Sequence, residues 1–347
     1  MTIQQTQQQI QSDGAGPQLI DGFGRHITYV RLSVTDRCDF RCTYCMAEQM
    51  SFLPRKELLT LEELDLVAST LIARGVRKLR ITGGEPLVRK GVIGLFEKLG
   101  RHIDTGKLDE LTLTTNGSQL PRHARALYQA GVRRVNISLD TLNADKFAEI
   151  TRWGTLDQPL DGMKAAQDAG LKVKLNSVAM QGVNDGEMEA LVAFAHENGA
   201  DITFIETMPL GAVDTDRAAD FLSLQSVRQQ LSQRWTLTDL TETTGGPARY
   251  VWCEQTGGKI GFITPMSHNF CATCNRVRLT CTGQLYMCLG HDDRVDLRAA
   301  VRSDAPMAAL NHALALAMQQ KPEKHDFSID PADPKPALSR HMSVTGG

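Results

Sequence analysis

An alternation of short apolar runs and amphipathic stretches between residues 27 and 207 constrains the fold of this 347-residue chain most strongly. The runs are rich in β-branched residues and lie at 28–34, 77–82, 110–114, 134–139, 172–178 and 202–206. Helical patterns separate them, at about 60–75, 91–101, 119–130, 158–169 and 186–198. Repeated strand–helix units predict a parallel sheet covered by helices. Because six units are too few to close a standard eight-stranded barrel, we expect an open partial barrel or a doubly wound sheet.

Polar and glycine-rich segments follow the predicted strands directly. They are Thr35-Asp36-Arg37-Cys38, Thr82-Gly83-Gly84-Glu85-Pro86, Thr115-Asn116-Gly117, Ser138-Leu139-Asp140 and Glu206-Thr207-Met208-Pro209. In both candidate folds, ligands bind beyond the carboxyl ends of the strands. The sequence therefore predicts a binding site on this edge of the sheet.

Four regions are expected along the chain. Residues 1–20 form a Gln-rich tail with too few apolar groups to offset the entropy of ordering, so we expect disorder there. Residues 21–210 hold the repeated units. Residues 211–321 mix a helical pattern near 224–233, strands at 248–254 and 259–264, and a last helix at about 303–320, which indicates an α+β segment. Residues 322–347 are Pro-rich, end in Gly-Gly, and are expected to be extended and mobile in isolation.

Composition excludes several functional classes. The formal net charge of −2 provides no basic field for nucleic acid, and no run of about 18 apolar residues could span a membrane. No Arg precedes Arg25, which argues against a mitochondrial targeting helix. Seven of the eight Cys gather near residues 40 and 280, unlike a disulfide framework spread along a secreted domain. We therefore expect a cytoplasmic protein with metal-binding or catalytic thiols.

The first cysteine window, Cys38, Cys42 and Cys45, follows the first predicted strand in a CxxxCxxC pattern. Three thiolates could hold a [4Fe-4S] cluster and leave one iron open to a small molecule. A zinc site with a distant fourth ligand and an unmetallated redox triple are the alternatives. With Tyr44 before the last Cys and Gly83-Gly84-Glu85-Pro86 after the second strand, the chain resembles the radical S-adenosylmethionine (SAM) superfamily. That resemblance implies SAM bound to the open iron and cleaved to a 5′-deoxyadenosyl radical.

The second window contains Cys271, Cys274, Cys281 and Cys288. Its spacing fits a four-Cys zinc knuckle as readily as an iron–sulfur site. Arg276 and Arg278 alternate on the intervening segment, so their guanidinium groups face one side and could hold an anionic substrate. A solvated edge strand is the plainer alternative.

The two cysteine windows together resemble the GTP 3′,8-cyclases of molybdenum cofactor biosynthesis, over residues 22 to about 302 and the final Gly346-Gly347. The resemblance implies an α/β fold, a partial (β/α)6 TIM-like radical SAM barrel whose mouth is closed by an α+β C-terminal segment. It also implies two [4Fe-4S] clusters, with Cys271, Cys274 and Cys288 holding the second. SAM would contact Tyr44, Gly84, Ser138 and Met208. GTP would contact Arg31, Arg80, Thr114, Lys174, Arg276, Val277 and Arg278.

The implied reaction is the conversion of GTP to (8S)-3′,8-cyclo-7,8-dihydroguanosine 5′-triphosphate, a lyase reaction in which side chains position groups and do not act as nucleophiles. Implied partners are GTP, a flavodoxin or ferredoxin-type reductant and the downstream cyclic pyranopterin monophosphate synthase, with a homodimer possible and neither nucleic acid nor membrane involved. The alternatives are another two-cluster radical SAM enzyme acting on a peptide, and a non-catalytic zinc and nucleotide-binding module.

Three residues lie outside the pattern of that family. Cys281 is expected to be a spare thiol near the second cluster, and Cys253 a core residue on a strand. Thr203 stands where the family often carries Arg, so another residue would have to take over the role of that Arg.

Overall fold

The computed structural model of the chain describes residues 18–211, 219–242, 244–327, 338 and 340–346, and within them it contains one mixed sheet of twelve strands. In spatial order the strands are β12 (Arg294–Asp296), β11 (Gln284–Tyr286), β10 (Arg276–Leu279), β1 (Tyr29–Ser33), β2 (Lys78–Thr82), β3 (Glu110–Thr115), β4 (Arg134–Ser138), β5 (Lys172–Ala179), β6 (Asp201–Glu206), β9 (Gly258–Ile263), β8 (Arg249–Cys253) and β7 (Leu237–Leu240). The strands from β10 to β9 run parallel, and antiparallel pairs extend both edges.

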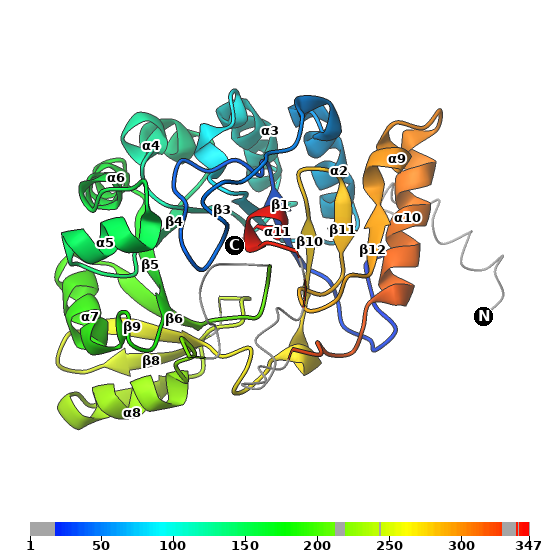
Figure 1. The fold of residues 1–347 in the computed structure, drawn as a ribbon. Helices are drawn as coiled ribbons and strands as arrows, with labels where there is room; N and C mark the ends of the chain where they lie inside the picture. The colour runs from blue at the N-terminus through cyan, green and yellow to red at the C-terminus, as the bar shows by residue number, and fades with distance from the viewer. Residues whose placement is uncertain (1–17, 212–218, 243, 328–337, 339, 347) are drawn as a thin grey trace.

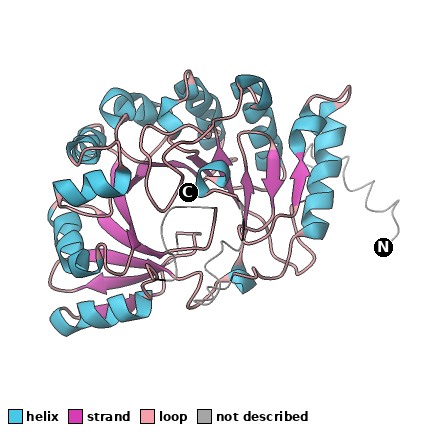
Figure 2. Cartoon of the chain, viewed as in Figure 1, coloured by secondary structure: helices cyan, strands magenta, loops and turns pink. Residues whose placement is uncertain are grey.

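Helices cover the outer face of this curved sheet (Figures 1 and 2). They are α2 (Leu61–Ala73), α3 (Val92–Asp104), α4 (Leu120–Gln129), α5 (Ala144–Thr151), α6 (Asp157–Asp168), α7 (Met188–Glu197), α8 (Leu224–Arg234), α9 (Leu297–Val301) and α10 (Pro306–Gln320). Single turns occur at η1 (Arg55–Glu57), η2 (Pro86–Val88), η3 (Asp185–Glu187) and η4 (Cys271–Thr273). The short helix α11 (Met342–Thr345), red in Figure 1, lies inside the curve. No helix of the described residues is both long and apolar enough to cross a bilayer.

Local sequence signals explain where several elements begin. Thr60 caps α2, because its hydroxyl accepts the N–H of Glu63 while the Glu63 carboxylate accepts the N–H of Thr60. Gly75, with φ of +100°, takes the left-handed conformation just beyond the end of α2. These features confirm the predicted helix start and stop.

Residue alternation divides the central strands into two faces. Leu32, Leu79 and Val135 point toward the helices and are fully buried in the hydrophobic core. On the same strands Arg31, Arg80 and other polar residues line the inner face of the curve. A sheet with one apolar and one polar face buries its core against helices and leaves the hollow for a ligand.

The predicted α/β architecture is confirmed, including the six strand–helix units. The C-terminal strands join the same sheet, because β10 pairs with β1 and β9 pairs with β6, both in parallel. The structure also contains α5, α9 and strands β7, β10, β11 and β12, which the periodicity did not predict as separate elements.

The described parts of the two predicted tails are ordered. Residues 1–17 lie outside the described residues, whereas Leu19 is buried and its N–H donates to the Arg74 carbonyl. In the Pro-rich tail, residues 328–337, 339 and 347 lie outside the described part. Residues 342–345 are helical and Ser343 and Thr345 are buried, which corrects the expectation of an extended segment.

Candidate active site

Two adjoining cavities lie inside the curve of the sheet. The first lies at the carboxyl ends of the parallel strands, and the second lies against the starts and middles of β1, β2, β4, β5 and β10. Cys38, Cys42 and Cys45 line the first cavity, and Cys271, Cys274 and Cys288 line the second. Four residues border both cavities and join them: Asn176, Ile205, Met208 and Met342. The structure therefore gathers the six predicted ligand cysteines around one continuous hollow.

The first cysteine loop is held by its own backbone. Arg41 is buried, and its Nη1 donates to the carbonyls of Cys38 at 2.6 Å and Phe40 at 2.7 Å. The N–H of Cys45 donates to the Cys42 carbonyl at 3.0 Å. These bonds fold the CxxxCxxC segment back on itself, so that its three free thiols face a single cavity.

The donor set fits an iron–sulfur cluster. The lining of the first cavity, as far as the structure describes it, contains three thiols and no histidine. Nowhere in the described residues do three His, Cys, Asp or Glu side chains converge tightly enough to hold one metal ion. A tetrahedral zinc ion needs such convergence, whereas the ligands of a cluster bind different iron atoms. His325 borders the second cavity, but the lack of such convergence among the described residues holds for the second triple too.

Acidic surroundings distinguish the first site. Burial raises the pKa of the Cys38 thiol, and the nearby Glu85 and Asp39 carboxylates raise it further. Burial also raises the pKa of Cys42, together with the charges of Cys45, Cys38 and Asp140. Binding of iron would release the protons of these thiols.

The Gly-Gly-Glu-Pro turn is explained by close backbone contact. A Cβ on Gly84 would lie 2.4 Å from the Arg37 carbonyl oxygen, and one on Gly83 would lie 2.7 Å from that of Thr35. The glycines thus let the loop after β1 lie against the loop after β2. The buried Glu85 carboxylate accepts the N–H groups of Leu87 and Asn116. Burial raises the pKa of Glu85 to about 8 against the effect of these bonds.

The structure places all four predicted SAM residues on the first cavity. The Tyr44 hydroxyl donates to Asp140 Oδ2 at 2.7 Å, which fixes the ring beside the thiols. Asp140 Oδ1 accepts the Val178 N–H at 2.8 Å, so one carboxylate ties the cysteine loop to β5. Thr114, predicted to contact GTP, also borders this first cavity, and its Oγ1 has no hydrogen-bond partner in the described part of the chain.

The second cysteine set lies among cations. Burial alone would raise the pKa of Cys274, but the charges of Lys321 and Arg276 lower it. Burial raises the pKa of Cys288, whose charged neighbours include Cys274 and Cys271. Of the four cysteines in the second window, Cys271, Cys274 and Cys288 border the second cavity and Cys281 does not.

Cys281 is the one that lies elsewhere. Its carbonyl accepts the Leu59 N–H, its charged neighbours are Asp36 and Arg89, and it borders neither cavity. Burial raises its pKa to about 12. The expectation of a spare thiol near the second cluster is therefore corrected, since β10 carries this residue past the cavity. Cys253 is fully buried in β8, as predicted for a core residue.

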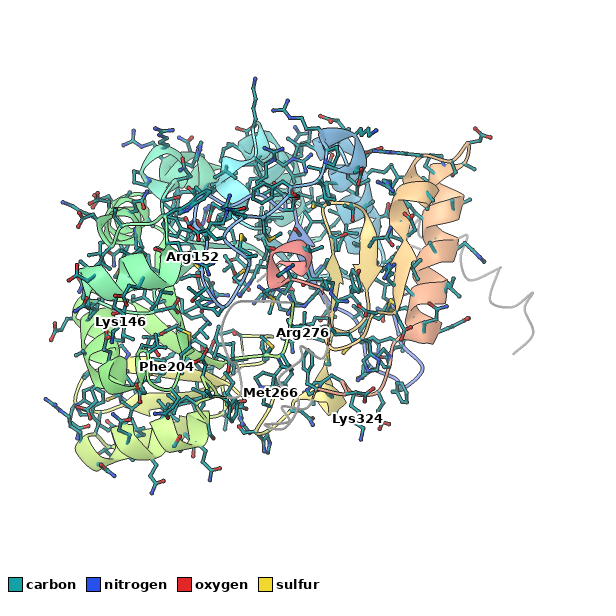
Figure 3. The ribbon with its side chains drawn as sticks, viewed as in Figure 1. Lys146, Arg152, Phe204, Met266, Arg276 and Lys324 are labelled. Atoms are coloured by element: carbon teal, nitrogen blue, oxygen red, sulfur yellow. The ribbon has the colours of Figure 1, made fainter. Side chains whose placement is uncertain are left out.

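Strand register assembles a row of cations across the second cavity. Arg278 on β10, Arg31 on β1 and Arg80 on β2 are register neighbours on three adjacent parallel strands. One row below, Tyr29 lies between Arg276 and Lys78. Arg276 also stacks on Phe270, 4.9 Å from the ring centroid, and Figure 3 shows it in the central hollow. Residues i and i+2 of a strand share a face, and parallel pairing aligns β10, β1 and β2. The basic side chains of these strands therefore form one patch.

These cations destabilise one another in the absence of an anion. Burial lowers the pKa of Arg31 to about 10, and Arg80 and Arg276 add to this effect. Burial likewise lowers the pKa of Arg278 and of Lys174, with Arg31 and Arg80 respectively as the largest charged contributors. Tyr29, Tyr250 and the Gly346 carbonyl offset part of this cost for Arg31, Lys174 and Arg278, and a polyanion in the cavity would offset more.

Tyr29, which sequence reasoning missed, is the acidic group within this patch. Burial would raise its pKa, but Arg80, Arg31, Lys78 and Arg276 together lower it to about 8. Its alternation with Arg31 on one strand was a usable signal, because residues i and i+2 share a face.

The remaining predicted residues have mixed positions. Lys174 faces inward and its Nζ donates to the Tyr250 hydroxyl at 2.8 Å, whereas Lys172 is exposed. Val277 borders the second cavity but belongs to the hydrophobic core. Thr203 is buried, and its Oγ1 has no hydrogen-bond partner among the described residues. Its neighbour across the pair is Gly261, where a Cβ would lie 2.7 Å from that oxygen.

The end of the chain reaches the basic row. Arg278 Nη1 donates to the Gly346 carbonyl at 2.6 Å, and Met342 of α11 borders both cavities. Upstream, the buried Arg340 guanidinium stacks on Tyr286 at 4.0 Å and donates to the Leu289 carbonyl. The C-terminal segment therefore covers the point where the cavities meet.

Two family models match the chain. Residues 32–195 match the Radical SAM superfamily, and residues 200–327 match Molybdenum Cofactor Synthesis C. The first match contains the Cys38 loop, and the second contains all three cysteines of the second cavity.

Curated relatives match nearly the whole length. A GTP 3′,8-cyclase of Rhizobium etli (strain CIAT 652) is 60% identical over 329 residues, covering 95% of this chain and 94% of that protein. The GTP 3′,8-cyclase of Caulobacter vibrioides is 61% identical over 332 residues, covering 96% of this chain and 95% of that protein. One from Agrobacterium fabrum is 60% identical over 329 residues, covering 95% and 94%.

Solved structures share the fold at low identity. Streptococcus suis SuiB bound to precursor peptide SuiA has a TM-score of 0.60 at 15% identity, covering 88% of this chain and 77% of that chain. Native anSMEcpe with bound AdoMet has a TM-score of 0.54 at 13% identity, covering 81% and 82%. These structures show the architecture alone.

Proposed function

The chain belongs to the GTP 3′,8-cyclase family of radical SAM enzymes, and on this premise we propose how its residues divide the reaction between the two cavities. It is a lyase that converts GTP to (8S)-3′,8-cyclo-7,8-dihydroguanosine 5′-triphosphate, the first step of molybdenum cofactor biosynthesis. Its cofactors are [4Fe-4S] clusters and SAM. The observation that carries the division is the pairing of one cysteine triple with carboxylates and the other with a row of arginines.

We assign one [4Fe-4S] cluster to each triple: Cys38, Cys42 and Cys45, and Cys271, Cys274 and Cys288. When bound, the first cluster and SAM would supply the radical chemistry that forms the C3′–C8 bond of the product, with an external reductant providing the electrons. In the first cavity, Tyr44, Gly84, Ser138 and Met208 are placed to hold SAM.

The basic row holds the triphosphate. Arg31, Arg80 and Arg278 present guanidinium groups from three adjacent strands, and Lys174 and Arg276 border the same cavity. Charge-assisted bonds from these groups neutralise the phosphates and remove the mutual repulsion of the cations. We propose that the ribose of GTP then faces the first cavity and that the base lies near Cys271, Cys274 and Cys288, which line the same cavity as the cations.

Apolar residues at the junction keep the reacting atoms dry. Ile205, Met208 and Met342 border both cavities, and α11 covers their meeting point. Exclusion of water and solutes from this junction protects a radical from side reactions. We attribute most of the remaining rate acceleration to the fixed position of GTP relative to SAM.

Finer assignments follow from the chemistry. We propose a flavodoxin or ferredoxin-type protein as the electron donor and cyclic pyranopterin monophosphate synthase as the next enzyme. We also propose a cytoplasmic location, where the eight free thiols would stay reduced. We also propose that the chain forms a homodimer.

The peptide-modifying alternative has weaker support. The peptide named with SuiB concerns that protein, and at 15% identity the likeness shows a shared fold only. A buried row of arginines suits a triphosphate better than a peptide, because a peptide offers few negative charges to offset it.

The proposed function is tested by anaerobic incubation of the reconstituted protein with GTP, SAM and dithionite. We expect 5′-deoxyadenosine to form in step with GTP consumption, with about eight Fe per chain from two [4Fe-4S] clusters. Stoichiometric zinc, or 5′-deoxyadenosine that forms at the same rate without GTP and leaves GTP unchanged, would contradict it.

A further inference from the structure

Lys321 is a buried cation beside the second cysteine triple. It follows α10 directly, and only 3% of its surface is exposed. Its Nζ lies 2.6 Å from the Met287 carbonyl oxygen, 3.1 Å from that of Arg276 and 3.8 Å from Cys274 Sγ. An ammonium group has three N–H donors, so these three acceptors use all of them.

The lysine bridges the segments that carry two of the three ligands. Arg276 follows Cys274 by two residues, and Met287 immediately precedes Cys288. The ammonium therefore lies between the backbones of β10 and of the loop after β11. The thiol of Cys274 is the only one of its three acceptors that can carry a negative charge.

Burial of an ammonium without a carboxylate costs several kcal/mol, which carbonyl dipoles offset only in part. Lys321 makes no salt bridge within the part of the chain that the structure describes. Arg25, which donates to the Cys271 carbonyl nearby, is by contrast paired with Asp21 at 2.7 Å. Among the described residues, the charge of Lys321 thus has no carboxylate counter-ion, while the Cys274 sulfur lies 3.8 Å from its Nζ.

A cluster held by three thiolates supplies that anion, and its negative charge increases by one when it accepts an electron. A fixed cation at this distance in a low-dielectric interior stabilises the reduced form more than the oxidised form. Reduction potentials of iron–sulfur clusters respond to such charges and to hydrogen bonds at their sulfurs.

We propose that Lys321 is the counter-charge of the second cluster and raises its reduction potential above that of the first. This rests on the proposed assignment of a [4Fe-4S] cluster to Cys271, Cys274 and Cys288. At the first site the charged groups with the largest effect on the Cys38 thiol are Glu85 and Asp39, and the buried Arg41 donates to the carbonyls of Cys38 and Phe40. The lysine is a positioning residue, because it acts on the reaction through the cluster and does not touch the reacting atoms.

The test measures the potential of the second cluster alone. In the full chain carrying Cys38→Ser, Cys42→Ser and Cys45→Ser, reconstituted anaerobically, the remaining cluster is titrated with reductant and followed by electron paramagnetic resonance. Lys321→Met removes the charge at similar length, and Lys321→Arg keeps it. Lys324→Met is the matched control, because Lys324 is exposed three residues further on and lies at the lower side of Figure 3.

We expect Lys321→Met to make reduction harder by about tenfold in equilibrium constant, which is 59 mV for one electron. Lys321→Arg and Lys324→Met should stay close to the parent. Equal potentials for Lys321→Met and Lys324→Met would overturn the proposal. If Lys321→Met cannot hold iron, retention by Lys321→Arg supports a counter-charge, whereas loss in both variants shows that the backbone bonds alone matter and overturns it.

The iron content of the parent separates this proposal from the proposed function. About four Fe per chain in the triple Cys→Ser parent supports the second cluster. No iron in that parent contradicts the cluster assignment itself, and with it the premise of this inference.

Discussion

The two cysteine sites have the same number of thiols but opposite electrostatic surroundings. Asp39 and Asp140 lie around the first triple with Glu85, whose raised pKa of about 8 leaves it charged only at higher pH, and Arg276 and Lys321 lie around the second. Negative neighbours disfavour an added electron and positive neighbours favour it. The first site is therefore suited to a strongly reducing cluster and the second to an anionic substrate.

This difference follows from position in the sheet. The first loop follows β1 and lies against the turns after β2 and β4, which carry Glu85 and Asp140, and against the amide of Asn116 after β3. The second set flanks β10, whose pairing with β1 brings Arg276 and Arg278 beside Tyr29 and Arg31. The neighbouring strands β1 and β10 thus contribute to two adjoining cavities of different charge, the first with carboxylates and the second with arginines.

Loss of a single thiol gives the largest expected effect on this comparison. Cys288→Ser should remove the second cluster and reduce iron from about eight to about four per chain, while Cys281→Ser should leave both clusters. Iron analysis and absorbance of anaerobically reconstituted protein measure this. Loss of iron in Cys281→Ser would show that the cavity assignment of the fourth cysteine is wrong.

Arg80→Met tests whether the row of Arg278, Arg31 and Arg80 binds the triphosphate of GTP and does not stabilise the fold. Loss of one charge-assisted bond worth about 1.5–3 kcal/mol should weaken GTP binding roughly ten- to a hundredfold. Because Arg80 lies among like charges, the same change should not lower the melting temperature of the protein without GTP. Titration calorimetry and thermal melts give the two quantities, with Arg77→Met, an exposed residue paired with Asp109, as the control.

A variant that loses stability and GTP affinity in proportion would assign Arg80 a structural role. Unchanged GTP affinity would place the triphosphate away from the row.

The pH dependence of GTP binding tests the phenol within the second site. The pKa of Tyr29 is about 8, so its side chain is neutral below that pH and a phenolate above it. The phenolate would repel the phosphates of GTP, whereas the neutral phenol would not. GTP affinity should therefore be constant below pH 8 and fall above it, by up to about tenfold per unit. Calorimetry from pH 7 to 9.5 measures the profile, and Tyr29→Phe should flatten it. An equally steep profile in Tyr29→Phe would assign the titration to another group.

The smallest expected effect concerns Glu85 in the metal-free protein. Its pKa is raised from 4.5 to about 8 in the folded state, so between these values the folded state binds more protons than the unfolded state. This group therefore contributes stability that is full below about pH 4.5 and is lost as the pH rises toward 8. Glu85→Gln should make the denaturation midpoint less dependent on pH over that window. An unchanged slope would show that Glu85 is ionised in the fold.

Sequence patterns predicted much of this architecture. The strand–helix alternation, the capping box at Thr60 and both cysteine windows depend on local spacing, which a sequence displays directly. The pairing of β10 with β1 joins residues about 250 positions apart, and no periodic pattern contains it. Tyr29 acquires its cation neighbours only through that pairing.

Lys321 shows the same limit within the site. It contacts Cys274 across 47 positions of sequence, at the end of a helix whose own pattern predicts nothing about a metal site. The Glu85 hydrogen bonds also depend on how the turns after β2 and β3 meet in space. Residue types predict which chemistry is available, whereas tertiary packing decides which groups share a cavity.

The assignment of SAM cleavage to the first site and of GTP binding to the second is tested most directly with the Cys288→Ser variant, incubated with SAM, GTP and dithionite. The first cavity is intact in this variant, so 5′-deoxyadenosine should still form while GTP consumption stops. The wild type should couple the two. Wild-type rates of GTP consumption in Cys288→Ser would contradict the assignment of the second cysteine triple to the substrate.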